Sequence, residues 1–174
     1  MRRLSIFILL FSIVVIGAQT RDYFIKLKTK VNSKRTLAIN VKTNLPDGTK
    51  LLVSVDRLYW ENNNESRYSG EIYSKDIEDE DGQINIITKI DDKKWKDEYR
   101  RKQIHFAKLN LFTGIRKVSP YIDIRILFSP RRNKNNKVLK ILGNDGEYMS
   151  GKNIRNDLGF NILDVDKRIK ISVK

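Results

Sequence analysis

The sequence has no cysteine and a single histidine, and these two scarcities exclude several kinds of chemistry. Without cysteine there is no disulfide, no thiolate nucleophile, no cysteine-bound zinc and no lipid anchor on an N-terminal cysteine. One histidine, His105, cannot build a metal site from several imidazoles. A Ser-His-Asp triad would have to include His105, and no serine lies in a Gly-x-Ser-x-Gly motif. We therefore expect a structural or solvent-facing His105, no catalytic residue, no metal and no cofactor.

Acidic residues are also in the minority. The chain has 35 Lys and Arg against 21 Asp and Glu, which gives a net charge of +14 at pH 7. Without Arg2 and Arg3 the remainder carries 33 basic and 21 acidic residues, or +12. This balance favours anionic partners such as nucleic acid, anionic lipid or acidic polysaccharide. Lys, Asn and Ile are abundant throughout, so composition drift in an AT-rich genome is the alternative explanation.

Residues 1–20 have the three-part form of a secretory signal peptide. Arg2 and Arg3 precede an apolar run from Leu4 to Ile16, which ends at small residues. The 15 residues from Leu4 to Ala18 would span roughly 22 Å as a helix, less than the ~30 Å core of a bilayer. We predict cleavage after Ala18, with an uncleaved N-terminal anchor as the alternative. Both place residues 19–174 outside the cytoplasm, in the periplasm or the extracellular space, which argues against nucleic acid as the partner.

The rest of the chain is long enough for one domain, and its main apolar period is two. Alternate residues are apolar over residues 36–43, 49–60 and 120–128, and two more strands are expected over 67–76 and 82–90. The final segment, 167–174, alternates in the same way. Apolar faces are expected at Leu37, Ile39, Val41, Leu51, Val53, Val55, Ile122, Ile124, Ile126 and Phe128. Many short strands separated by polar turns predict an antiparallel sandwich or barrel.

Two segments interrupt the strand pattern. The turn NLPDG, residues 44–48, is expected to form a β-hairpin or a corner, with Pro46 at the first central position and Gly48 free to take a positive φ. Over 92–102 the aromatic residues recur at helical spacing after a capping aspartate, which predicts a short helix. After Gln103 the alternation of a strand is expected to return, with Leu109 and Leu111 continuing it.

Several segments resemble a group of small exported bacterial proteins of unassigned function. The shared pattern begins with TNLPDGT at residues 43–49 and ends with ILGNDGEYMSG at residues 141–151. The weaker segments LNLFTG and SPYIDIRILFSP lie between them, and the resemblance covers about residues 36–151. It implies an extracytoplasmic β-sandwich of one domain and implies no activity. Together with the strand pattern it predicts an all-β fold, a single antiparallel immunoglobulin-like β-sandwich over residues 19–174.

The acidic run from Asp76 to Asp81 could offer oxygen ligands to calcium, but it lacks the spaced carboxylates and the later glutamate of a calcium loop. A solvated hairpin loop is the simpler interpretation. Tyr59 and Trp60 could form a stacking shelf for a sugar or a peptide. Because neighbours on a strand face opposite ways, we expect them to cover the edge of the core instead.

Basic residues concentrate in two segments. The first lies on the predicted helix, where most basic side chains would face outward, and the second follows Pro130 in what is expected to be an exposed loop. If both lay on one face, they would form a positive field able to hold an anionic polymer or a membrane surface. The candidate residues are Lys93, Lys94, Lys96, Arg100, Arg101 and Lys102, then Arg131, Arg132, Lys134, Lys137 and Lys140.

The sequence thus predicts an exported, non-catalytic binding or interaction module of the cell envelope, and leaves its ligand and oligomeric state open. Two alternatives come from other classes: a hydrolase that uses Asp and Glu side chains, and a structural envelope protein held by an uncleaved N-terminal helix.

Overall fold

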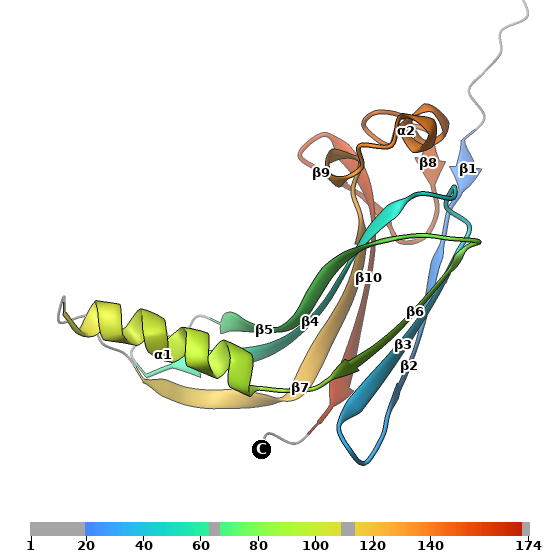
Figure 1. The fold of residues 1–174 in the computed structure, drawn as a ribbon. Helices are drawn as coiled ribbons and strands as arrows, with labels where there is room; N and C mark the ends of the chain where they lie inside the picture. The colour runs from blue at the N-terminus through green and yellow to red at the C-terminus, as the bar shows by residue number, and fades with distance from the viewer. Residues whose placement is uncertain (1–19, 63–66, 109–113, 172–174) are drawn as a thin grey trace, which may run out of the picture.

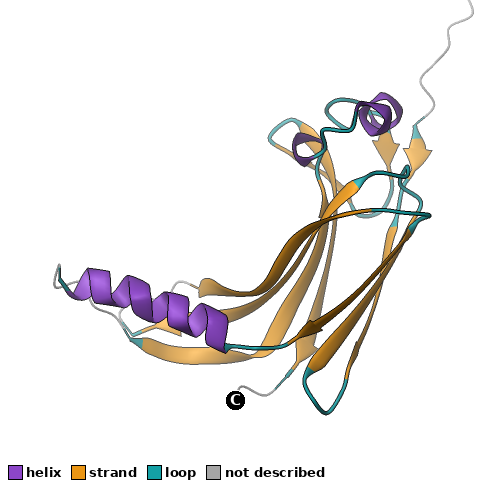
Figure 2. Ribbon diagram, in the orientation of Figure 1, coloured by secondary structure: helices purple, strands orange, loops and turns teal. Residues whose placement is uncertain are grey.

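The computed structural model describes residues 20–62, 67–108 and 114–171, without the side chains of His105 and Phe106 (Figure 1). Strands dominate this part of the chain, and helices occupy two separate places (Figure 2). The first half contains β1 (Arg21–Asp22), β2 (Ile25–Val31), β3 (Thr36–Thr43), β4 (Lys50–Glu61), β5 (Arg67–Glu78) and β6 (Gln83–Lys89). The second half contains α1 (Lys93–Ala107), β7 (Ile115–Phe128), the 3-10 helix η1 (Pro130–Arg132), α2 (Asn136–Leu142), β8 (Met149–Ser150), β9 (Ile154–Asp157) and β10 (Phe160–Lys170).

The longer strands form two antiparallel sheets. The five-stranded sheet has the order β5-β4-β7-β10-β9, and the three-stranded sheet has the order β2-β3-β6. A short parallel pair, β1 with β8, lies apart from both. The prediction of a β fold is therefore confirmed at the level of class.

One core lies between the apolar faces of the two sheets. All ten side chains predicted for these faces on β3, β4 and β7 are buried in it, so the period-two analysis is confirmed there. Ile25 of β2, Ile84 of β6 and Leu163 of β10 complete the core from the neighbouring strands. Complete burial of each aliphatic side chain contributes about 1.5–3 kcal/mol, so this core is the main source of stability.

The NLPDG segment is a corner, because β3 and β4 belong to different sheets. The Thr49 amide donates to the carbonyl of Pro46 at 3.1 Å, so Pro46 is the first residue of the turn and not a central one as predicted. Gly48 is central, with a φ of 80°. Only glycine takes this conformation without strain, and the predicted positive φ is confirmed.

Helix α1 is longer than the predicted 92–102, and the predicted return of strand alternation after Gln103 is wrong. The buried side chains Trp95, Tyr99 and Gln103 recur every fourth residue, so the helical period continues to Ala107. Leu109 and Leu111, expected to extend that strand, lie outside the described residues.

The segment after Pro130 is also helical, which corrects the predicted exposed loop. Val138 and Leu142, four residues apart, are fully buried on one side of α2. The Asn135 side chain caps the helix by accepting from the Lys137 amide at 3.0 Å, and Gly143 ends it with a φ of 90°.

The C-terminal strand differs from the expected pattern, and the predicted leader lies outside the described residues. The final strand, β10, begins at Phe160, well before the predicted residue 167, and residues 172–174 lie outside the described part. The leader, residues 1–18, also lies outside it. Within residues 20–171 as described, no helix is long and apolar enough to cross a membrane.

Candidate anionic-ligand surfaces

Helix α1 is fixed to the five-stranded sheet by aromatic stacking. The ring of Trp95 lies over Tyr59 of β4 with 5.1 Å between centroids, and Tyr99 meets Tyr59 edge-on at 5.4 Å. Gly70 of β5 makes room, because a Cβ atom there would lie 2.5 Å from Trp95. Burial, then the nearby charge of Glu61, raises the pKa of Tyr59 to about 12. Tyr59 is thus part of the packing under α1, as its predicted structural role requires.

The start of α1 is held by the carboxylate of Asp92, which accepts hydrogen bonds from three elements. Arg57 Nε of β4 donates at 2.6 Å, Arg35 Nη2 from the β2–β3 turn at 3.0 Å, and Trp95 Nε1 at 3.0 Å. Arg57 is fully buried and also donates to the carbonyl of Ser119 at 2.8 Å. Removing the carboxylate would leave a buried guanidinium charge without its counterion, so this cluster fixes where α1 sits.

All six basic residues predicted on the helix do lie on α1, but several have acidic neighbours. Lys93 and Arg100 share Asp97, Lys102 pairs with Glu98 at 3.0 Å, and Lys94 pairs with Glu71 of β5 at 2.8 Å. Arg101 is exposed, and Lys96 lies 5.8 Å from the Trp95 ring. The helix keeps a positive surplus, since Asp97 and Glu98 are its only acidic residues.

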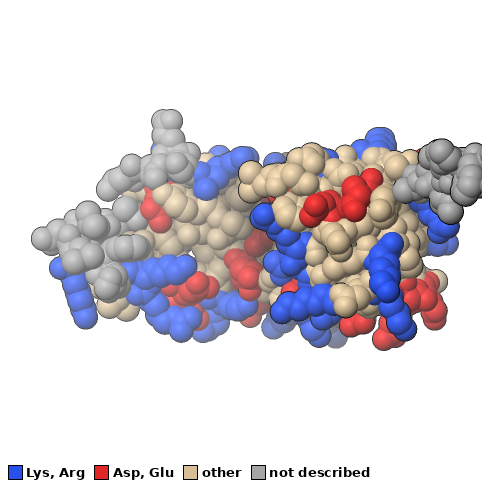
Figure 3. All heavy atoms as spheres, turned by 90° about the horizontal axis from the view of Figure 1, so that it is seen from above, with Lys and Arg blue, Asp and Glu red and all other residues tan. Residues whose placement is uncertain are grey.

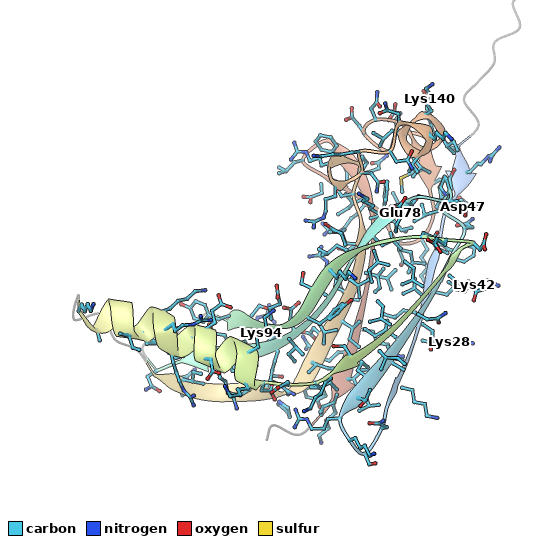
Figure 4. The ribbon with its side chains drawn as sticks, in the orientation of Figure 1. Lys28, Lys42, Asp47, Glu78, Lys94 and Lys140 are labelled. Atoms are coloured by element: carbon cyan, nitrogen blue, oxygen red, sulfur yellow. The ribbon has the colours of Figure 1, made fainter. Side chains whose placement is uncertain are left out.

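The second basic segment is at a different end of the molecule. Arg131 and Arg132 belong to η1, Lys137 and Lys140 to α2, and Lys134 lies between them. Lys94 on α1 and Lys140 on α2 are far apart in Figure 4. Arg132 pairs with Asp76 at 2.8 Å, and Arg131 lies over the Phe160 ring at 3.9 Å. The two segments are therefore separate patches and not one continuous surface. On the face shown in Figure 3, Lys and Arg occur in both halves of the molecule, interspersed with Asp and Glu.

A third basic surface is formed by the outward face of the three-stranded sheet, which we call the lysine face. Its cross-strand register aligns Lys26 with Lys42 and Gln83, Lys28 with Asn40 and Asn85, Lys30 with Ala38 and Ile87, and Thr36 with Lys89. These outward positions hold five lysines and neither Asp nor Glu. Lys28 and Lys42 point away from the sheet in Figure 4.

The sequence analysis missed the lysine face, although its signal was present. In IKLKTKV, residues 25–31, every second residue is a lysine and Ile25 and Leu27 alternate with them. This is the pattern of a strand with one apolar and one basic face. The sequence analysis identified only segments in which basic residues lie close together in sequence, such as those on α1 and α2. On β2 an uncharged residue separates each lysine from the next, so no such cluster appears.

Two cavities flank α1 and share Lys96 and Arg100 as lining residues. One, of about 540 Å³, is mainly apolar and is lined also by Tyr99, Gln103, Ile104, Ala107, Gly114 and Ile115. The other, of about 420 Å³, is polar and lies between the β2–β3 turn and the first turns of α1. Its other lining residues are Ser33, Lys34, Arg35, Lys89, Ile90, Asp91, Asp92, Lys93 and Asp97.

The acidic run is not the fully solvated loop that was predicted. Asp79 is completely buried at the corner between the sheets, and its carboxylate has no side-chain hydrogen-bond partner among the described residues. Burial, then the charges of Asp47 and Asp81, raises the pKa of Asp79 to about 6, and the nearby backbone amide of Gln83 offsets only part of this rise. Asp47 and Glu78 lie together at this corner in Figure 4. Nowhere in the described ranges do three acidic or histidine side chains stand close enough to hold a metal ion.

Carboxylates also occur on the outward face of the five-stranded sheet, where arginines pair with them. Asp164 accepts from Arg125 at 2.6 Å and from Arg155 at 2.7 Å, and Asp123 pairs with Arg168 at 2.6 Å. Burial alone would raise the pKa of Asp164, but the two arginines outweigh it and hold that pKa below its ordinary value. These ion pairs link the neighbouring strands β7, β9 and β10. They do not test the hydrolase alternative, which stays a prediction.

Comparison with models of known protein families, with curated proteins and with solved structures finds no match to this chain. The resemblance to small exported bacterial proteins therefore stays a prediction, and the functional argument depends on the surfaces themselves.

Proposed function

We propose that this chain is an exported, non-catalytic binding module of the cell envelope, built on an immunoglobulin-like β-sandwich, whose lysine face attaches it to an anionic surface or polymer. The observation that carries the proposal is the lysine face itself: five lysines on neighbouring strands, with no carboxylate between them. On α1, by contrast, four of the six basic residues form ion pairs with Asp97, Glu98 or Glu71.

The geometry of a sheet suits an extended anionic target. Alternate residues on one strand are about 7 Å apart and neighbouring strands about 5 Å apart, so the lysines form a regular array of charges. Each lysine near an anionic membrane contributes about 1 kcal/mol. A flat array gains most from a target that presents many charges at once, such as anionic headgroups or a phosphate-bearing wall polymer. The leader favours such envelope targets over nucleic acid.

The proposal is tested by binding of the purified protein to phosphatidylglycerol vesicles, phosphatidylcholine vesicles and purified teichoic acid. Binding to the anionic targets is expected to weaken steeply between about 0.1 M and 1 M salt, as the Debye length falls from ~10 Å to ~3 Å. Replacing Lys26, Lys28 and Lys30 by Ser is expected to lower affinity about a hundredfold, from about 1 kcal/mol for each lysine.

The matched control replaces Lys134, Lys137 and Lys140 by Ser, which removes the same charge from the α2 end. If that control lost as much affinity as the β2 variant, only net charge would matter and the lysine face would not be the site. Equal binding to phosphatidylcholine, or binding that salt does not weaken, would leave the basic surface as composition drift.

A further inference from the structure

The apolar cavity beside α1 exposes hydrocarbon in an otherwise charged region. Ile104 is 64% exposed although the same helix buries Trp95 and Tyr99, and Ala107 and Ile115 lie beside it in the cavity wall. The cavity volume of about 540 Å³ is within the range of about 300–1,000 Å³ found for small-molecule sites. An apolar wall with cations at its edge is suited to an amphiphile.

We propose that this cavity binds one acyl chain of an anionic phospholipid, with the headgroup held by Lys96 and Arg100. The inference goes beyond the proposed attachment, because the acyl-chain cavity lies beside α1 and no residue of the lysine face lines it. Of the five lysines of that face, only Lys89 lines the adjoining polar cavity. The acyl chain would lie against Tyr99, Ile104 and Ile115, and the phosphate of the headgroup would lie beside Lys96 and Arg100, which line both cavities.

Charge complementarity selects an anionic headgroup. The polar cavity is lined by six cationic side chains and three carboxylates. Asp92 is already engaged by Arg35 and by Arg57, so it offers little negative charge to a ligand. Asp97 is shared between Lys93 and Arg100 in exposed pairs. Exposed pairs are weak, so a phosphate group can compete for Arg100 at little cost.

The aromatic packing keeps the site rigid. Trp95 and Tyr99 anchor the buried side of α1 on Tyr59, so Lys96, Arg100 and Ile104 project from a fixed backbone. A preformed site loses less conformational entropy when the ligand binds than a surface that must first become ordered.

The test is titration calorimetry of the purified protein with lysophosphatidylglycerol below its critical micelle concentration. Lysophosphatidylcholine of the same chain length and glycerol phosphate without a chain serve as comparison ligands. Lysophosphatidylglycerol is expected to bind about tenfold more tightly than either, because it alone supplies both the chain and the net negative charge.

Two pairs of variants identify the subsites. Ile104→Ser is expected to weaken lysophosphatidylglycerol binding about tenfold, whereas Ile87→Ser removes an even more exposed isoleucine on β6 and is expected to leave that binding unchanged. Lys96→Gln with Arg100→Gln is expected to weaken binding about tenfold, unlike Lys137→Gln with Lys140→Gln on α2. Melting temperatures of all variants identify any loss of folding, and the comparison ligands test the site in the unaltered chain.

The outcomes separate this proposal from the attachment through the lysine face. Failure of lysophosphatidylglycerol to bind, or binding no tighter than that of glycerol phosphate, would overturn the acyl-chain site while salt-sensitive vesicle binding could persist. Equal affinity for the zwitterionic lipid would overturn the role of Lys96 and Arg100. Conversely, a Lys26→Ser, Lys28→Ser, Lys30→Ser variant that loses vesicle binding but still binds lysophosphatidylglycerol would show two independent sites.

Discussion

Asp79 is a residue whose ionisation opposes folding. Its carboxylate is buried without a side-chain hydrogen-bond partner in the described part of the chain, and its pKa rises from an ordinary 3.8 to about 6. Below about pH 3 the group is protonated in both folded and unfolded protein and carries no penalty. Between pH 3.8 and about 6 the unfolded chain ionises while the folded carboxyl keeps its proton, so the free energy of unfolding falls with rising pH. Above that range the folded protein buries the charge, and the total loss is up to about 3 kcal/mol.

Replacing Asp79 by Asn is therefore expected to stabilise the protein in a pH-dependent way. The amide is neutral and nearly the same size as the protonated acid, so the two proteins should unfold at similar urea concentrations at about pH 3 and below. At pH 7 and above, the variant should gain up to about 3 kcal/mol over the natural chain. Urea denaturation across this pH range measures the difference. Two stability curves that run parallel would mean that Asp79 is hydrated in the folded protein.

At the scale of elements, the docking of α1 on β5 depends on a glycine, Gly70, which has no side chain. A Cβ atom at Gly70 of β5 would lie 2.5 Å from the Trp95 ring, which is closer than packed atoms tolerate. Gly70→Ala is expected to lower the free energy of unfolding by about 2 kcal/mol, the usual cost of overpacking a rigid contact. Ser74→Ala, at an exposed position of the same strand, should change it by less than about 0.5 kcal/mol. Equal effects of both changes in urea denaturation would contradict a tight contact between β5 and α1.

The sequence predicted elements well where one period dominated. Val53 and Ile124 were assigned to buried faces because alternation marks a strand with one dry side. The predictions were wrong at the helices. The predicted end of α1, residue 102, was too early because Ile104 and Phe106 also fit the alternation of a strand. Helix α2 was not predicted because its seven residues are too few to establish a helical period. The site could be predicted only in part, because the neighbours of Lys28 and the burial of Asp79 depend on which strands pair.

At the scale of the whole molecule, export is the prediction with the most direct measurement. The Arg-led apolar run of residues 2–18 predicts removal of the leader after Ala18. Mass spectrometry of protein from an envelope fraction is expected to show an N-terminus at or within a few residues of Gln19. An intact Met1 in the envelope fraction would support the anchored alternative, and protein found only in the cytoplasm would contradict both.

The carboxylate of Asp92 joins parts of the chain that are far apart in sequence, Arg35, Arg57 and Trp95. Detaching α1 from the sheets would remove Asp92 and leave the buried guanidinium of Arg57 without its counterion, and an unpaired buried charge costs several kcal/mol. Separating the helix from the sheets is therefore expected to cost a large part of the free energy of global unfolding, which is about 5–15 kcal/mol for a domain. Helix and sheets are then expected to open as a single cooperative unit, so the hydrogen-bonded amide protons of α1 from Lys96 onward should exchange with solvent mainly through global opening.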